Sequence, residues 1–163
     1  MVHNNSPAGK SCYIAVITAR EVSALILQYT EYPAVFLTGA AGYSLIEIIW
    51  RGYTHWSMAL TGGVCFLFLY IIERGYESEP LWKKCAAGSL FITVSELVVG
   101  FVVNILLGWA VWDYSDLTFN IAGQICPLYT VLWFFLCFPV SLVCTGLRRL
   151  YSQLGVSVAT STR

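Results

Sequence analysis

Four apolar runs, each long enough to cross a bilayer, constrain this chain more than any other feature. A helix needs roughly 20 mostly apolar residues to cross the hydrocarbon core, so four runs of that kind take up most of the 163 residues. Only 11% of the residues are charged, compared with about 25% in soluble domains. The sequence therefore predicts a single all-α membrane domain, a polytopic helical bundle, and leaves no room for a soluble catalytic or nucleotide-binding domain.

Charged residues and tryptophans interrupt the apolar runs and place the spans. In the last run, Pro127 and Pro139 each remove a backbone hydrogen bond and should bend the helix. The Ser/Thr/Val-rich segment 151–163 is expected to be a flexible tail. The predicted membrane domain is 33–150, with spans at about 33–50, 56–72, 85–109 and 121–147.

Residues 1–32 are predicted to be a polar N-terminus followed by an interfacial amphipathic helix. Asn4 begins a triplet that fits the N-glycosylation pattern, which would be used only if the N-terminus were outside. The apolar stretch 12–29 is interrupted by Arg20 and Glu21, which a lipid-exposed span tolerates badly. An interfacial helix leading into the first span therefore fits best, and a fifth crossing is the alternative.

The basic residues predict the orientation in the membrane. With the N-terminus inside, four spans put eight of the nine Lys and Arg residues on the inner side and leave Arg51 outside. Cytoplasmic loops are enriched in Lys and Arg, so both termini are predicted to be cytoplasmic. Aromatic rings prefer the membrane interface, and four tryptophans then gather at the outer one: Trp50, Trp56, Trp109 and Trp112.

Several classes of function find no support in the sequence. The net charge is zero, so electrostatics gives no argument for nucleic-acid binding. The six cysteines lie mostly in apolar runs, where cysteine acts as a small hydrophobe, and with only two histidines neither a metal nor another cofactor is expected. The chain has no GxxxxGK[ST] phosphate-binding loop and no recognisable nucleophile–base pair, so it is not expected to be an enzyme.

One face of the third span carries small and polar residues at helical spacing. The glycines and serine on this face fit helix packing, because small residues let backbones approach closely. Glu96 is different, since a charged side chain near mid-span costs a few kcal/mol. It must be neutral, paired, or facing a wet cavity. The residues of this face are Ser89, Thr93, Glu96, Gly100, Asn104 and Gly108.

A second carboxylate lies toward the outer end of the first span. Glu47 precedes Arg51 by four residues, a spacing that favours an ion pair within one helix. Alternatively, Glu47, Glu96 and Asp113 converge on one polar cavity that opens outward. Carboxylates in such a cavity bind a cation or relay protons.

The polar segment between the third and fourth spans begins with the element Trp-Asp-Tyr-Ser. Asp113 and Ser115 can hydrogen-bond nearby backbone N–H groups and fix a turn, and Asn120 or Thr118 can cap the fourth helix. Tyr114 offers a phenol at the interface. The segment is either a rigid turn or a loop that contacts substrate. Turn and packing roles are assigned to Trp112, Ser115, Gly100 and Gly123.

These features together resemble a known family. The pattern combines Glu47, Glu96 with Gly100, the Trp-Asp-Tyr-Ser element, and Asn120-x-x-Gly123-x-Ile125-Cys126 followed by Trp133. It is similar to the small bacterial membrane proteins described as putative ABC-transporter type IV (CmpB-like) and to small animal transmembrane proteins with the same element.

The resemblance covers about residues 33–147. It implies a polytopic membrane protein, and its label alone implies a nucleotide-binding partner subunit. The opening of the second span, 54–63, lacks the prolines and arginine usual in the bacterial relatives.

We predict a transporter- or permease-like protein with an outward-facing polar cavity. Four helices enclose little volume, so a homo-oligomer or a larger membrane partner is expected. The alternative is an accessory or scaffold protein whose polar residues specify helix packing. An intramembrane enzyme acting on lipid ranks last. The predicted substrate- or ion-binding residues are Glu47, Glu96, Asn104, Asp113, Tyr114 and Asn120.

Overall fold

The computed structural model describes the backbone of residues 7–160 and the side chains of residues 22, 26 and 29–154. Within this part the chain forms long helices without a strand. Four stretches are long and apolar enough to cross a membrane: Tyr29–Arg51, Trp56–Gly75, Leu81–Leu106 and Pro127–Leu154. The prediction of an all-α fold with four spans is confirmed. The helices are α1 (Pro7–Arg51), α2 (Trp56–Gly75), α3 (Leu81–Gly100), the π-helical turn η1 (Phe101–Leu106) that continues α3, and α4 (Pro127–Thr160).

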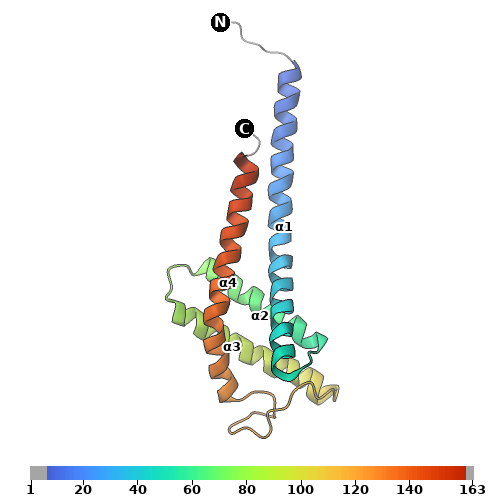
Figure 1. Cartoon of the computed structure of the whole chain (residues 1–163), viewed down its shortest axis with the longest axis vertical. Helices are drawn as coiled ribbons and strands as arrows, with labels where there is room; N and C mark the ends of the chain where they lie inside the picture. The colour runs from blue at the N-terminus through green and yellow to red at the C-terminus, as the bar shows by residue number, and fades with distance from the viewer. Residues whose placement is uncertain (1–6, 161–163) are drawn as a thin grey trace.

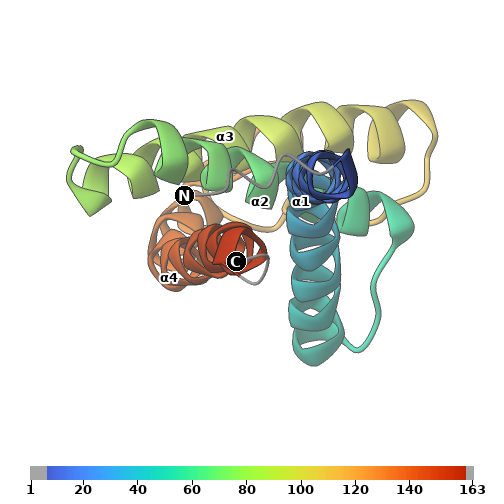
Figure 2. The ribbon, with the colours of Figure 1, turned by 90° about the horizontal axis from the view of Figure 1, so that it is seen from above.

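The helices do not form a parallel bundle. Helices α1 and α4 run along the long axis of the molecule, and the α2–α3 hairpin crosses them obliquely (Figure 1). Seen from above, α4 is viewed nearly end-on whereas α2 and α3 lie across the view (Figure 2). The start of α1 and the end of α4 lie at the same end of the molecule, as an even number of spans requires.

The first helix is longer than the predicted span. Its 45 residues extend about 68 Å at 1.5 Å per residue, although the hydrocarbon core is only about 30 Å thick. The segment 12–29, predicted as a separate interfacial helix, continues without a break into the first span, and Pro33 lies inside the helix. That the segment 12–29 lies at the membrane surface stays a prediction. The triplet that begins at Asn4 lies outside the described residues.

The fourth helix begins and ends later than predicted. It starts at Pro127, where the missing proline N–H costs nothing because the first N–H groups of a helix have no partner. Pro127 therefore starts the helix, and the prediction that it bends the span is wrong; Pro139 lies inside α4. Residues 121–126 belong to the preceding loop, because Ala122 and Gly123 have positive φ angles of 54° and 69°. Beyond Tyr151, the predicted tail continues α4 to Thr160.

Glycines bring the backbones of α1 and α2 together. A Cβ atom on Gly39 would lie 2.8 Å from Phe66 Cγ and 2.9 Å from the Gly62 carbonyl oxygen. On α2, a Cβ on Gly63 would lie 2.7 Å from Phe36 Cζ. Each glycine thus leaves the space that an aromatic ring of the facing helix fills, which is how small residues drive helix packing in lipid.

Hydroxyl groups join α3 to α4. Ser89 Oγ donates to the Thr130 carbonyl oxygen at 2.6 Å, and the hydroxyls of Thr93 and Thr130 are 3.1 Å apart. The small and polar face of the third span therefore meets the fourth. Five cysteines are free and buried, and the side chain of Cys12 lies outside the described residues. One buried apolar cluster consists of Val35, Leu69, Tyr70, Cys85, Cys137 and Cys144, and a second consists of Met58, Val103, Val111 and Trp112.

The substitution Gly39→Ala should destabilise the protein by about 1–3 kcal/mol, the cost of overpacking a close contact. The cause is the clash of the new methyl group with Phe66 and with the α2 backbone. Unfolding of the purified protein by sodium dodecyl sulfate in mixed micelles measures the change. Gly42→Ala is the matched control, because nothing lies within 4 Å of a Cβ atom at that position. Equal stability of the two variants would contradict the packing account.

Candidate functional site

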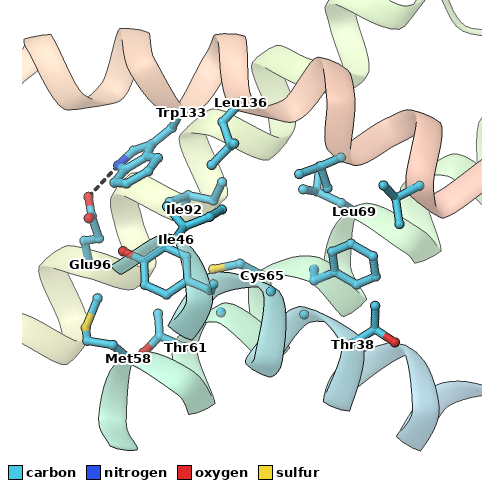
Figure 3. Close-up of a pocket in the computed structure, with 17 residues that line it drawn as sticks. Thr38, Ile46, Met58, Thr61, Cys65, Leu69, Ile92, Glu96, Trp133 and Leu136 are labelled. Atoms are coloured by element: carbon cyan, nitrogen blue, oxygen red, sulfur yellow. Dashed lines mark hydrogen bonds between the residues drawn. The ribbon is translucent and has the colours of Figure 1, made fainter. Parts of the chain in front are cut away.

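A cavity of about 220 Å³ lies where all four helices meet (Figure 3). Its wall is almost entirely apolar, and Glu96 is the charged residue in it. Ile46 of α1 and Val143 of α4 belong to the wall and are 43% and 48% exposed. The cavity therefore opens to the surface of the molecule between α1 and α4. The other lining residues include Tyr43, Met58, Cys65, Leu69, Trp133 and Leu136.

Neutral donors hold the Glu96 carboxylate. The side chain is buried, with 3% of its residue surface exposed. Trp133 Nε1 donates to Oε2 at 2.8 Å, and the Tyr114 hydroxyl lies 3.4 Å from Oε1. An ionised carboxylate can accept about four hydrogen bonds, so one short and one long bond leave it with accepting capacity. Among the described side chains, none forms an ion pair with Glu96.

Aromatic rings surround this carboxylate. Tyr43 and Trp133 have ring centroids 6.3 Å apart, and both line the cavity. Tyr129 stacks on Tyr114 at 4.4 Å and lies 5.9 Å from Trp133. Burial, and secondarily the nearby Glu96, raises the pKa of Tyr114 far above its usual range. The Tyr114 phenol is therefore neutral and able to donate.

Glu47 does not join Glu96 in the cavity. Its Oε1 pairs with Arg51 Nη2 at 2.5 Å, and its Oε2 accepts from Thr54 Oγ1 at 2.5 Å. The same guanidinium donates through Nη1 to the Val111 carbonyl oxygen at 2.8 Å. The ion pair within one helix, one of the two predicted alternatives, is what the structure contains, and it also connects α1 to the loop after the third span.

Asn104 faces this loop rather than the cavity. From η1, its Nδ2 donates to the Trp112 carbonyl oxygen at 3.0 Å and to Gln124 Oε1 at 2.7 Å, and its Oδ1 accepts from the Val111 N–H at 2.7 Å. The ring of Trp112 is buried, and its Nε1 donates to the Gln124 carbonyl oxygen at 3.0 Å. A Cβ atom on Gly100 would lie 2.9 Å from Trp112 Cζ2, so the glycine makes room for the loop.

The Trp-Asp-Tyr-Ser element forms a turn on the surface. Asp113 Oδ1 accepts from the Ser115 N–H at 2.9 Å and from Ser115 Oγ at 2.5 Å, and these bonds lower the pKa of the exposed Asp113. A Cβ atom on Gly123 would lie 2.6 Å from Asp113 Oδ1. Asn120 donates to the Ser115 and Leu117 carbonyl oxygens and accepts from the Gly123 N–H. The prediction that Asn120 or Thr118 caps the fourth helix is wrong, because α4 begins only at Pro127 and Asn120 closes this loop instead.

Of the six predicted binding residues, the structure therefore brings two together. Glu96 lines the cavity, and Tyr114 contacts Glu96 from the loop. The hydrogen bonds of the other four go to their own helix end or loop. Trp133, a donor to Glu96, was not predicted as a site residue. In the sequence, Trp133 stands out only as one of the residues that carry the family resemblance.

The family model described as "Putative ABC-transporter type IV" matches residues 63–160, which is more than half of the chain. The chain belongs to this family. The matched part includes Glu96, Tyr114 and Trp133, whereas the α1 wall of the cavity precedes it. No curated protein and no solved structure matches the chain.

This family member also has a buried charge cluster, joining α2, α3 and α4, that the sequence analysis missed. Glu73 Oε2 pairs with Lys84 Nζ at 2.7 Å, and the two side chains are 6% and 11% exposed. Ser141 donates to the other carboxylate oxygen, and Arg148 donates to the Glu73 carbonyl oxygen at 2.7 Å. The sequence signal for this cluster is the pair of charged residues Glu73 and Arg74, which directly follow the second predicted span.

A second cavity, of about 260 Å³, lies near this charge cluster. There the Tyr70 hydroxyl and Arg74 Nη1 both donate to Glu31 Oε1, the latter at 3.0 Å. In the described part of the chain, no group of three His, Cys, Asp or Glu residues is arranged to hold a metal ion. The lining residues are Glu31, Tyr70, Arg74, Arg148, Tyr151 and Ser152.

The substitution Asn104→Asp should release the loop from the third span. An aspartate keeps the acceptor for the Val111 N–H but loses both donated bonds and sets a carboxylate against the two oxygens of Trp112 and Gln124. Leaving buried groups unpaired costs about 1–3 kcal/mol. Faster amide exchange across 107–126 and a red shift of tryptophan emission measure the release. Asp116→Asn, an exposed change in the same loop, should alter neither.

Asp113→Asn should preserve the turn, because an amide oxygen accepts the same two bonds from Ser115. Asp113→Ala should lower the melting temperature, since the Ser115 N–H and hydroxyl lose their acceptor. Because the folded-state pKa of Asp113 is depressed, its contribution is present above about pH 4 and is lost as pH falls further. The Asn variant should lack this acid-dependent loss. Melting curves at pH 7 and in an acidic series test both expectations, and an Asn variant as unstable as Ala would contradict them.

Proposed function

We propose that this protein is a transporter-like, permease-type membrane protein and that the cavity beside Glu96 holds its solute. The observation that carries the proposal is a buried carboxylate with accepting capacity in the wall of an otherwise apolar cavity among all four spans. Ionisable residues inside membrane spans are costly and usually mark a pathway. The apolar wall indicates a small, mostly apolar solute rather than a hydrated one.

The opening between α1 and α4 indicates entry from the bilayer. Ile46 and Val143 border it and are half exposed, so a solute dissolved in hydrocarbon reaches the cavity without crossing a polar surface. On the other side, Tyr114 joins Glu96 to the loop after the third span. We propose that a solute at Glu96 competes with this long 3.4 Å contact and so alters the packing of the loop.

One chain supplies a binding site rather than a complete pathway. We therefore propose that a second copy or a larger membrane partner completes it, with both termini cytoplasmic. The chain is proposed not to be an enzyme, and ATP would have to act through a separate nucleotide-binding subunit, which the family name suggests. Lys84 and Arg148 belong to the charge cluster, and Arg74 pairs with Glu31 nearby. This gathering of basic side chains supports the proposed orientation.

A scaffold role is the second candidate, and the loop favours it. Asn104, Asp113 and Asn120 bond to the chain's own loop, and Glu47 pairs with Arg51. These contacts give each of the four residues a structural role that needs no solute. On this account the bond between Glu96 and Trp133 would serve only to hold α3 against α4.

Glu96→Gln separates the two functions, because glutamine keeps the shape and still accepts from Trp133 but lacks the charge. If the protein is a transporter, the variant should move solute at least tenfold more slowly. If it is a scaffold, the variant should be as stable as the wild-type protein, and dye release should not change. Release of neutral and cationic lipophilic dyes from proteoliposomes measures movement. Gly42→Leu, which fills the cavity from an open position, should block release without touching Glu96.

Glu79→Gln is the matched control, since this carboxylate forms an exposed pair with Lys83 and should leave release unchanged. If no dye leaves faster with the wild-type protein than with Gly42→Leu, the cavity is not a solute site and the scaffold role is favoured.

A further inference from the structure

We infer that the solute of the Glu96 cavity is a lipophilic organic cation: a small apolar body carrying one amine or quaternary ammonium group. This inference rests on the proposed function and specifies its substrate class. It is carried by the charges around the cavity, the use of the hydroxyl groups in its wall, and the position of its aromatic rings.

The first argument is charge. Six glutamates have described side chains, and five of them form an ion pair. Glu96 is the sixth, and the described part of the chain gives it no cationic partner. A buried carboxylate without a counter-charge is costly, and a cation placed beside it in a low-dielectric site is strongly attracted. The paired glutamates are Glu31, Glu47, Glu73, Glu77 and Glu79.

Two basic side chains of the helices that surround the cavity already have partners. Arg51 contacts Glu47 and the Val111 carbonyl oxygen, while Lys84 pairs with Glu73 in the charge cluster. None of these side chains lines the cavity. A cation that neutralises Glu96 must therefore come from outside the described chain.

The second argument concerns polar groups. Two threonine hydroxyls line the cavity, and both donate to their own helix: Thr38 to the Ala34 carbonyl oxygen and Thr61 to the Ser57 carbonyl oxygen, each at 2.8 Å. A sugar or another solute with many hydroxyls would leave most of them unpaired, which costs about 1–3 kcal/mol for each group. An anion would be repelled by Glu96. The Tyr43 phenol also lines the wall, but Glu96 is its one charged residue, which matches one charged group on an apolar body.

The third argument is aromatic. Tyr43 and Trp133 line the cavity beside Glu96, and tryptophan and tyrosine faces attract ammonium groups within about 6 Å. The volume of about 220 Å³ exceeds that of an engineered 150 Å³ protein cavity that holds benzene. A cation with one aromatic ring is therefore of suitable size.

Phenyltrimethylammonium and tert-butylbenzene test the substrate class, because the two molecules have the same shape and differ in one charged nitrogen. Binding of each to the purified full-length protein is measured by titration calorimetry in detergent–lipid micelles, with protein-free micelles as the blank. The cation should bind at least tenfold more tightly than the hydrocarbon. Glu96→Gln should abolish this preference while leaving the hydrocarbon affinity unchanged.

A second variant guards against failure of Glu96→Gln to fold. Tyr43→Leu keeps an apolar wall and removes one ring, so the affinity for the cation should fall severalfold and that for tert-butylbenzene should not. Gly42→Leu should weaken both, which shows that both occupy the cavity. Cation binding that survives Gly42→Leu unchanged would place the site elsewhere and overturn the inference.

The outcomes separate this inference from the function on which it rests. If both probes bind equally and Glu96→Gln changes neither affinity, the cavity is a site for neutral lipophilic solutes and the cation class is wrong. The proposed function then stands if Gly42→Leu still blocks the release of the neutral dye. If neither probe binds and neither dye is released by the wild-type protein, both proposals are overturned.

Discussion

The contact of Asn104 with the loop after the third span supports the rest of this structure. Its amide satisfies three backbone or side-chain groups at once, at Val111, Trp112 and Gln124. Near a membrane such groups have few other partners. The contact buries the Trp112 ring and so places Tyr114 against Glu96. Without it, the cavity would lose its connection to the loop.

This loop holds a backbone that its sequence does not favour. Ala110, Phe119 and Ala122 have φ angles of 47°, 60° and 54°, a left-handed conformation that L-residues other than glycine rarely adopt. Such residues cost on the order of 1–3 kcal/mol each and persist where surrounding contacts fix them. The hydrogen bonds of Asn104, Asp113 and Asn120 are those contacts. Their polarity is thereby explained without a ligand, whereas Glu96 has neutral donors but no cationic partner among the described side chains.

Local chemistry made part of this structure predictable. Hydropathy located four spans because the membrane thickness sets their length. The Asp113–Ser115 turn and the Glu47–Arg51 pair follow from spacings of two and four residues, which fix which groups meet. The apolar lining of the cavity was not predictable, and the predicted polar cavity is not what the structure contains, because hydropathy does not set how a helix is rotated about its axis. The π-helical turn η1, which carries Asn104, further decides which way that side chain points.

The two polar centres of the helices differ in one physical respect. Glu73 is as buried as Glu96, but it carries its own cation, Lys84, and a hydroxyl from Ser141. Removing either partner would leave a buried charge without compensation and would destabilise the protein. The charge cluster therefore needs no further ligand. Among the described residues Glu96 has only neutral donors, and it lines a cavity that opens between α1 and α4. In the proposed function, a solute that enters this cavity supplies the counter-charge that the described side chains do not give Glu96.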